Sequence, residues 1–117
     1  MNYDLEERTS QFGEDVIGFV KTMQVNYITK PLISQLIRAA TSIGANYMEA
    51  NQASSKKDFR NKIFICKKEA HESTYWLRML AKADVGIKTE CQKLWKEAHE
   101  LVLIFGKISA SCKTDGV

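Results

Sequence analysis

Apolar residues recur along most of the chain at alternating steps of three and four, the spacing of amphipathic helices. This pattern predicts four helices, over residues 5–24, 31–52, 56–83 and 89–110. In the second and third helices the steps alternate strictly between four and three, which is typical of helices that pack lengthwise against a partner. The stripe residues of these two helices are Leu32, Leu36, Ala39, Ile43, Asn46, Ala50 and Ala53, and then Phe59, Ile63, Cys66, Ala70, Ser73, Leu77 and Leu80.

The segments between the predicted helices are short and carry helix-start signals. Pro31 suits the first turn of the second helix, where its missing N–H costs nothing. Ser55, three residues before Asp58, resembles a capping box with aspartate in place of glutamate. Residues 111–117 lack periodicity and are expected to fray. Because short connections make consecutive helices antiparallel neighbours, the sequence predicts one all-α domain over residues 1–117, an up-down-up-down antiparallel four-helix bundle.

The third helix carries more apolar surface than one stripe needs. Phe64, Ile65, Tyr75 and Met79 all lie outside the stripe, and Phe64 and Tyr75 are expected to point largely outward. Exposed aromatic patches commonly mark association surfaces. These four residues are therefore the candidate interface of a homo-oligomer.

Polar residues occur in the second helix where a plain core helix would carry leucine. Asn46 lies on the stripe, and Arg38, Ser42 and Glu49 border it. An antiparallel hairpin that turns near residues 53–55 would place Glu49 opposite Arg60, which predicts an ion pair between them. Such polar groups can fix the register of packed helices. Contact of the same residues with a ligand is the alternative.

Composition limits the classes of protein that fit. A chain of 117 residues with 44% hydrophobic and 26% charged residues is typical of a globular domain. No signal peptide is apparent, and no apolar run reaches the roughly 20 residues that span a bilayer. Cys66, Cys91 and Cys112 are odd in number and lack CxxC spacing. They are expected to be reduced thiols, which favours a cytoplasmic location.

The net charge of +3 is modest, but the charges are unevenly distributed. Residues 1–20 hold five acidic side chains against one basic, whereas residues 51–70 hold six basic against two acidic. A solvated helix face explains such a run without a ligand. A contact with nucleic-acid phosphates is the functional interpretation. The candidate phosphate-binding residues are Lys56, Lys57, Arg60, Lys67 and Lys68.

No catalytic or metal site is predicted. A di-iron bundle needs Glu-x-x-His on two helices. Here "KEAHE" occurs twice, at residues 68–72 and 96–100, but each glutamate precedes its histidine by only two residues, on a different side of the helix. P-loop, GxGxxG and HExxH patterns are absent. The sequence therefore favours a non-enzymatic protein without a cofactor.

Two segments, "LISQLIRAATSIGANYMEAN" and "SSKKDFRNKIFICKKEAHESTYWLRML", resemble the bacterial four-helix-bundle family of 23S rRNA intervening-sequence proteins. The accessory protein of diversity-generating retroelements is related to that family. One departure is Ala50, where the family often has glycine. The matching positions are Gln35, Arg38, Ala39, Ser42, Ile43, Asn46, Glu49, Glu69, Glu72, Trp76 and Leu77.

The resemblance implies a small bundle assembled into a ring of five copies, with no catalytic residue to carry over. The related retroelement protein binds nucleic acid and a reverse transcriptase through a basic ring surface. Sequence and resemblance together predict a homo-oligomer that associates with RNA. The alternative is a protein-interaction scaffold without a nucleic-acid ligand, in which the basic stretch solvates the surface or pairs with an acidic helix of a neighbour.

Overall fold

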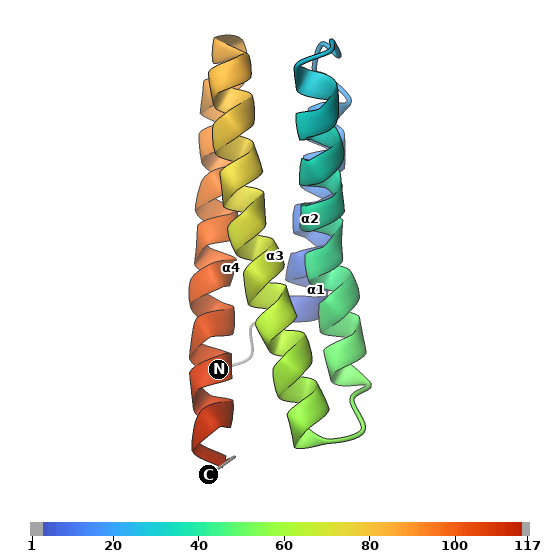
Figure 1. Ribbon diagram of the computed structural model, residues 1–117, viewed down its shortest axis with the longest axis vertical. Coiled ribbons are helices and arrows are strands. Elements are labelled where there is room, and N and C mark those ends of the chain that lie inside the picture. Colours follow the sequence, from blue (N-terminus) through green and yellow to red (C-terminus); the bar gives the residue numbers. More distant parts are fainter. Residues whose placement is uncertain (1–3, 116–117) are drawn as a thin grey trace.

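Four long helices run alternately up and down in the computed structural model, which describes residues 4–115 (Figure 1). The helices are α1 (Leu5–Val20), α2 (Thr29–Asn51), α3 (Lys56–Ala83) and α4 (Lys88–Asp115), and a 3₁₀ turn, η1 (Val85–Ile87), joins the last two. The bundle measures 48 × 22 × 20 Å. The predicted all-α, up-down-up-down antiparallel four-helix bundle is confirmed.

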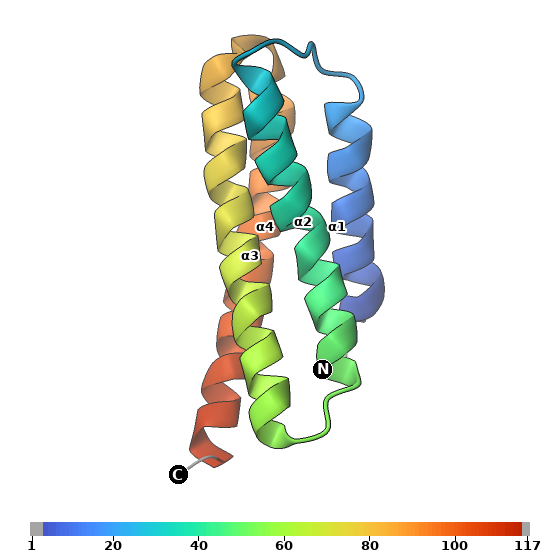
Figure 2. The same cartoon turned by 45° about the vertical axis from the view of Figure 1, so that its right-hand side comes forward.

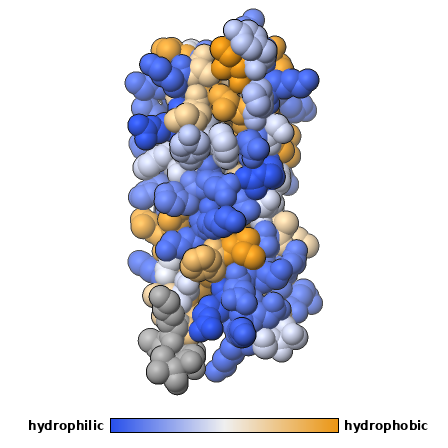
Figure 3. Space-filling view, in the orientation of Figure 1, coloured by the Kyte–Doolittle hydropathy of each residue, from blue (hydrophilic) through white to orange (hydrophobic). Residues whose placement is uncertain are grey.

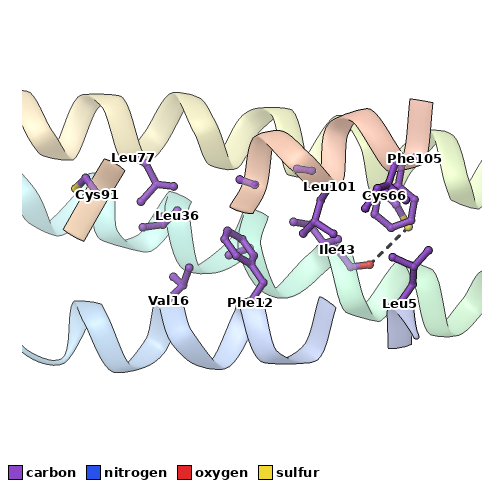
Figure 4. Close-up of a cluster of buried hydrophobic side chains, with 14 of the residues drawn as sticks. Leu5, Phe12, Val16, Leu36, Ile43, Cys66, Leu77, Cys91, Leu101 and Phe105 are labelled. Carbon is purple, nitrogen blue, oxygen red and sulfur yellow. Dashed lines mark hydrogen bonds between the residues drawn. The ribbon is translucent and has the colours of Figure 1, made fainter. Parts of the chain in front are cut away.

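The core is built from the apolar stripes that face one another along the bundle axis. Phe12 of α1, Leu36 and Ile43 of α2, and Phe105 of α4 are at most 1% exposed. Figure 4 shows these side chains converging between the helices, with the Cys66 thiol donating to the carbonyl oxygen of Ile43 at 3.6 Å. All stripe residues of α3 beyond Phe59 are buried. The heptad spacing therefore identified the buried face of α3 correctly.

The contact between Ile43 and Cys66 also tests the predicted register of the α2–α3 hairpin. The sequence placed Glu49 opposite Arg60, and therefore Ile43 opposite Cys66, six residues further from the turn on each helix. The hydrogen bond between Cys66 Sγ and Ile43 O joins that pair. The predicted register is confirmed at this position.

The connection between α1 and α2 differs from the prediction at both ends. The α1 helix ends at Val20 rather than near residue 24, and α2 begins at Thr29, two residues before Pro31. Asn26 Oδ1 accepts from the backbone N–H groups of Ile28 and Thr29, both at 2.9 Å. These bonds satisfy donors that a helix start otherwise leaves free, so α2 starts earlier. Met23 remains buried although it lies outside the helix.

The fourth helix continues past its predicted end at residue 110, and the fraying of residues 111–117 stays a prediction. The α4 helix continues to Asp115, whereas residues 116–117 lie outside the described part of the chain. The sequence loses its apolar periodicity there because residues 113–115 are lysine, threonine and aspartate. The helix can nevertheless continue, since no proline or glycine occurs between Gly106 and Gly116. Loss of an apolar stripe ends burial, and it does not by itself end a helix.

The first helix is shorter than its neighbours, and this leaves one end of the bundle with three helices. At 16 residues, α1 compares with 28 each for α3 and α4. Figure 2 shows that α1 starts well above the α2–α3 connection. It packs mainly on α2 and touches α4 much less. Over the described residues, α2, α3 and α4 continue past α1 at this end, which we call the open end of the bundle.

None of the helices, over the described residues, is both long and apolar enough to cross a membrane.

Candidate nucleic-acid interface

Three of the predicted phosphate-binding residues lie together at the open end of the bundle. Lys56, Lys57 and Arg60 line a depression of about 660 Å³ between the α2–α3 turn and the end of α4. Phe59 and Cys112 also line it, whereas no carboxylate does among residues 4–112, the part of the chain whose side chains the structure describes. We call this site, defined by Lys56, Lys57 and Arg60, the basic end.

The first turn of α3 is fixed by a side-chain cap. Ser55 is extended, and its Oγ accepts from the backbone N–H of Asp58 at 3.0 Å, as the capping pattern predicted. Helix N-termini carry a partial positive charge from their unpaired N–H groups. The cationic side chains of Lys56 and Lys57 lie in this same turn, so the backbone and the side chains contribute potential of the same sign.

Lys67 and Lys68 do not line the depression. Each follows a lysine of the basic end, Lys56 or Lys57, by eleven residues, which is three turns and about 16 Å along the helix. Lys67 lies against α4 at Gly106. Lys68 is exposed on the outward side of α3. The five predicted residues therefore form two rows along α3 rather than one cluster.

All five of these cations are without a carboxylate partner among the described residues, but neighbouring Lys62 is paired. Its Nζ donates to Glu49 Oε1 at 2.6 Å. The predicted Glu49–Arg60 ion pair is therefore wrong. Residue 62 lies one heptad before Glu69, on the side of α3 that faces α2, whereas Arg60 lies about 200° around the helix from Lys62. The sequence register was correct along the helix axis, but it did not account for rotation about it.

Arg38, like Glu49, is a member of the polar motif that joins α2 to α3. Its guanidinium donates to Glu69 at 3.1 Å and also to Glu72. The hydrogen bond to Glu72 is the largest cause that raises the pKa of Arg38 above its ordinary value. Glu69 is only 9% exposed. A buried carboxylate is thus neutralised by a cation from the neighbouring helix.

Ser42 and Asn46 bond within their own helix. The Ser42 hydroxyl donates to the Arg38 carbonyl, and Asn46 Nδ2 donates to the Ser42 carbonyl at 2.8 Å. These bonds satisfy polar side chains on a partly buried face without a partner helix. Of the four motif residues, Arg38 and Glu49 make the contacts between helices.

The candidate oligomer interface is exposed as the sequence predicted. Phe64 is 61% and Tyr75 52% exposed, while Ile65 and Met79 are half-buried. An eleven-residue separation places Phe64 and Tyr75 within about 20° of each other on α3. On the face shown in Figure 3, hydrophobic residues form separate small patches among mostly hydrophilic ones.

The sequence missed an ion pair between α1 and α4. Arg8 Nε donates to Glu97 at 2.8 Å, and its Nη2 lies 3.0 Å from Glu100. The hydrogen bond to Glu97 is the main cause of a raised pKa of Arg8. Arg8 is the one basic residue of an otherwise acidic segment, and that was a usable signal. Nothing in the spacing indicated which helix supplied the carboxylates.

Within the described residues, no three histidine, cysteine or acidic side chains lie close enough to hold a metal ion. His71 and His99 are both exposed. Cys66, Cys91 and Cys112 are all free thiols.

Comparison with known proteins gives one family and a structural relative. The family described as 23S rRNA-intervening sequence protein matches residues 2–110. A solved structure from Bacteroides thetaiotaomicron, a protein with unknown function from the S23 ribosomal protein family, has a TM-score of 0.78 and 28% identity. The match covers 89% of this chain and 96% of that one. No curated protein matches.

Proposed function

This chain belongs to the 23S rRNA-intervening sequence protein family, and we propose that it is a non-enzymatic protein that associates with RNA through the basic end. The observation that carries the proposal is the depression lined by Lys56, Lys57 and Arg60, with no carboxylate among its described lining residues. Unpaired cations around an open concave surface are suited to phosphate oxygens.

Lys67 and Lys68 extend the proposed contact along α3. They stand about 16 Å beyond the basic end, one on the α4 side and one on the outward side. Such a row suits a nucleic-acid backbone that follows the helix, whereas a small anion would occupy the depression alone. Because these side chains are positioned for phosphates and no set of base-reading residues is evident, binding shows little sequence preference.

Assembly of several copies is part of the proposal. Phe64 and Tyr75 present an aromatic surface on α3, next to Ile65 and Met79. Burial of these residues between copies would repeat the +3 charge of each chain around the assembly. A ring, with five copies as the resemblance implies, would present several basic ends to one RNA and raise its affinity by multivalency. The location in this proposal is the cytoplasm.

The salt dependence of RNA binding tests the proposal. Fluorescence anisotropy with a structured RNA is expected to show about a 100-fold loss of affinity between 50 and 200 mM salt, because each phosphate contact releases counterions. Lys56→Glu/Lys57→Glu is expected to weaken binding and to reduce the slope of log affinity against log salt by about 2. Glutamate is favourable in the first turn of a helix, so this variant keeps its fold.

A matched control is Lys21→Glu/Lys30→Glu, which removes the same charge from exposed lysines outside the basic end. It is expected to retain most of the affinity and the slope. Equal losses in both variants would show that only net charge matters, and absence of binding at 50 mM salt would refute RNA association.

A scaffold that binds protein is the second candidate, and one observation favours it. Asp4, Glu7 and Asp15 line an acidic depression between α1 and α4, together with Arg8 and its partner Glu97. This surface is complementary in charge to the basic end of another copy or of a partner protein. The scaffold predicts a co-purifying protein and an absorbance spectrum free of nucleic acid. The RNA proposal predicts a raised 260/280 nm ratio before washing at high salt.

A further inference from the structure

A second groove lies at the opposite end of the α3–α4 pair from the basic end. It is lined by Arg78 of α3 and by Lys88, Trp95 and Lys96 of α4, and its volume is about 520 Å³. Residues 56 and 78 are about 33 Å apart along α3. We call it the Trp95 groove. It is too far from the basic end to belong to the same contact.

Apolar side chains form the floor of the groove. Leu77 and Cys91 are at most 2% exposed, and Ala81 is half-buried beside them. Burial raises the pKa of the Cys91 thiol to about 11, so the floor is neutral at physiological pH. The groove therefore combines an uncharged base with a charged rim, as sites for aromatic anions do.

The rim carries positive charge that the described part of the protein does not neutralise. Arg78, Lys88 and Lys96 have no carboxylate partner there, and no carboxylate lines the groove. The acidic groups nearest in sequence are engaged elsewhere. Glu90 accepts from Lys93, Asp84 accepts from the backbone N–H of Gly86, and Glu97, next to Lys96, accepts from Arg8. The rim of the groove is thus complementary in charge to a polyanion.

Trp95 adds an aromatic surface to this rim. Its side chain is 39% exposed although it lines the groove. The indole stacks on the imidazole of His99, with ring centroids 4.9 Å apart and an interplanar angle of 12°. One turn of α4 separates the two residues, so the helix itself holds the rings parallel. A flat ring supported from one side is a stacking platform for a further planar group.

We propose that the Trp95 groove binds single-stranded RNA, with one base stacked on Trp95 and the flanking phosphates on Arg78, Lys88 and Lys96. This inference rests on the RNA association proposed above and specifies the form of RNA. Stacking on a protein ring needs a base whose face is free, and a duplex covers both faces of its internal bases. Charge complementarity selects the polyanion, and the indole selects one with exposed planar groups.

Tryptophan fluorescence reports on this groove directly. The chain has two tryptophans, and Trp76→Phe leaves Trp95 as the only one. Trp76 Nε1 is buried without a hydrogen-bond partner among the described residues, so phenylalanine removes no bond. An oligouridylate of about ten nucleotides is expected to quench the Trp95 emission of this variant. An abasic oligomer of the same length is expected to leave the emission unchanged. In the reverse variant, Trp95→Phe, the emission of the remaining Trp76 is expected not to change when the oligouridylate is added.

Affinity measurements separate stacking from charge. Trp95→Ala is expected to weaken oligouridylate binding about tenfold and abasic binding not at all. Lys88→Glu/Lys96→Glu is expected to weaken the binding of the oligouridylate and of the abasic oligomer alike. Trp95→Leu keeps an apolar side chain at the edge of the groove but no aromatic ring. It is expected to show the same loss of oligouridylate affinity as Trp95→Ala. Circular dichroism confirms the fold of each variant.

Three results would overturn the inference. The first is oligouridylate binding that leaves Trp95 emission and the affinity of Trp95→Ala unchanged. The second is equal quenching by a duplex of the same length, and the third is quenching by polyglutamate but not by RNA. If RNA binding then still depends on Lys56 and Lys57, the basic end stands and only the Trp95 groove fails. If no RNA binds at low salt, both fail.

Discussion

Residue-scale contacts show how single polar side chains are stabilised within a small core. Arg38 serves two carboxylates of α3, and Arg8 serves two of α4. In each case one guanidinium fork satisfies acceptors that a lysine would reach only one at a time. The α1–α4 and α2–α3 contacts are therefore specified by charge as well as by apolar packing.

Replacement of Arg38 by alanine is expected to lower the free energy of unfolding by about 1–2 kcal/mol, because Glu69 is left buried without its cation. Lys62→Ala is the matched control. It breaks another α2–α3 ion pair, but Glu49 has a side chain 58% exposed and stays hydrated. Its expected cost is clearly smaller, because a solvent-exposed ion pair contributes little to stability. Urea unfolding measures both, and equal losses would contradict the importance of burial.

The three thiols are expected to differ in reactivity because they differ in burial. Desolvation raises the pKa of Cys66 to about 12 and that of Cys91 to about 11. Cys112 is half-buried at the basic end. At pH 8 a disulfide reagent is expected to modify one thiol per folded chain quickly and all three in urea. Cys112→Ser is expected to abolish the fast phase, and persistence of that phase would refute the assignment.

The same two buried thiols predict a loss of stability at alkaline pH. In the folded protein they hold their protons to pH 11–12, whereas an unfolded cysteine releases its proton near pH 8.5. Their stabilising contribution is thus complete below about pH 8.5 and is lost as the pH rises through the folded values. Cys91→Ala is expected to show a shallower decline than the wild type between pH 9 and 11. An identical decline would rule out Cys91 as a cause.

At the scale of the helix, α1 lies close to α2 at Gly44, a residue without a side chain. A Cβ at Gly44 would lie 3.4 Å from Thr9 Oγ1 and 3.5 Å from the Thr9 carbonyl carbon. Gly44 lies beside the main stripe of α2, and a side chain larger than a methyl group there would meet α1.

Valine substitutions at two glycines test this close approach. Gly44→Val is expected to lower stability by about 1–3 kcal/mol, because it pushes α1 off α2. Gly18→Val is the control, since a Cβ at Gly18 meets nothing within 4 Å. That exposed position is expected to gain slightly from a better helix former. Thermal unfolding compares the two, and similar shifts would contradict the tight α1–α2 contact.

Helix identity and buried faces were predictable because periodicity and capping are local. The capping pattern of Ser55 and Asp58 predicted the start of α3, and the apolar stripe predicted which face of α3 is buried. The extension of α4 past residue 110 was not predictable, because polar residues carry no period. Nor was the choice of Lys62 over Arg60 by Glu49, since rotation about a helix axis is set by tertiary packing. The separation of Lys67 and Lys68 from the basic end follows from eleven residues of helix and could have been predicted. The Trp95 groove could not, because it forms where α3 and α4 pack together.

The whole molecule is a rod with a basic end, an acidic depression between α1 and α4, and exposed aromatic residues on α3. These features suit assembly with other copies and with a polyanion. The proposed assembly depends on Phe64 and Tyr75, whereas the proposed RNA contact depends on cations of the same helix. The two can therefore be separated by mutation.

Phe64→Ser/Tyr75→Ser is expected to shift sedimentation at micromolar concentration to the 13.3 kDa chain, since buried aromatic residues dominate interface energies. Met48→Ser/Leu103→Ser removes two residues of comparable exposure, 54% and 53%, from α2 and α4. This control is expected to sediment as the wild type does. Monomer formation in the control alone would move the interface away from α3.

Native mass spectrometry of protein purified at low salt tests association with RNA and with other copies together. The account predicts masses at a multiple of 13.3 kDa that carry additional mass removed by ribonuclease. Lys56→Glu/Lys57→Glu is expected to keep the multiple and lose the additional mass. A single species at 13.3 kDa, unchanged by ribonuclease, would contradict the account.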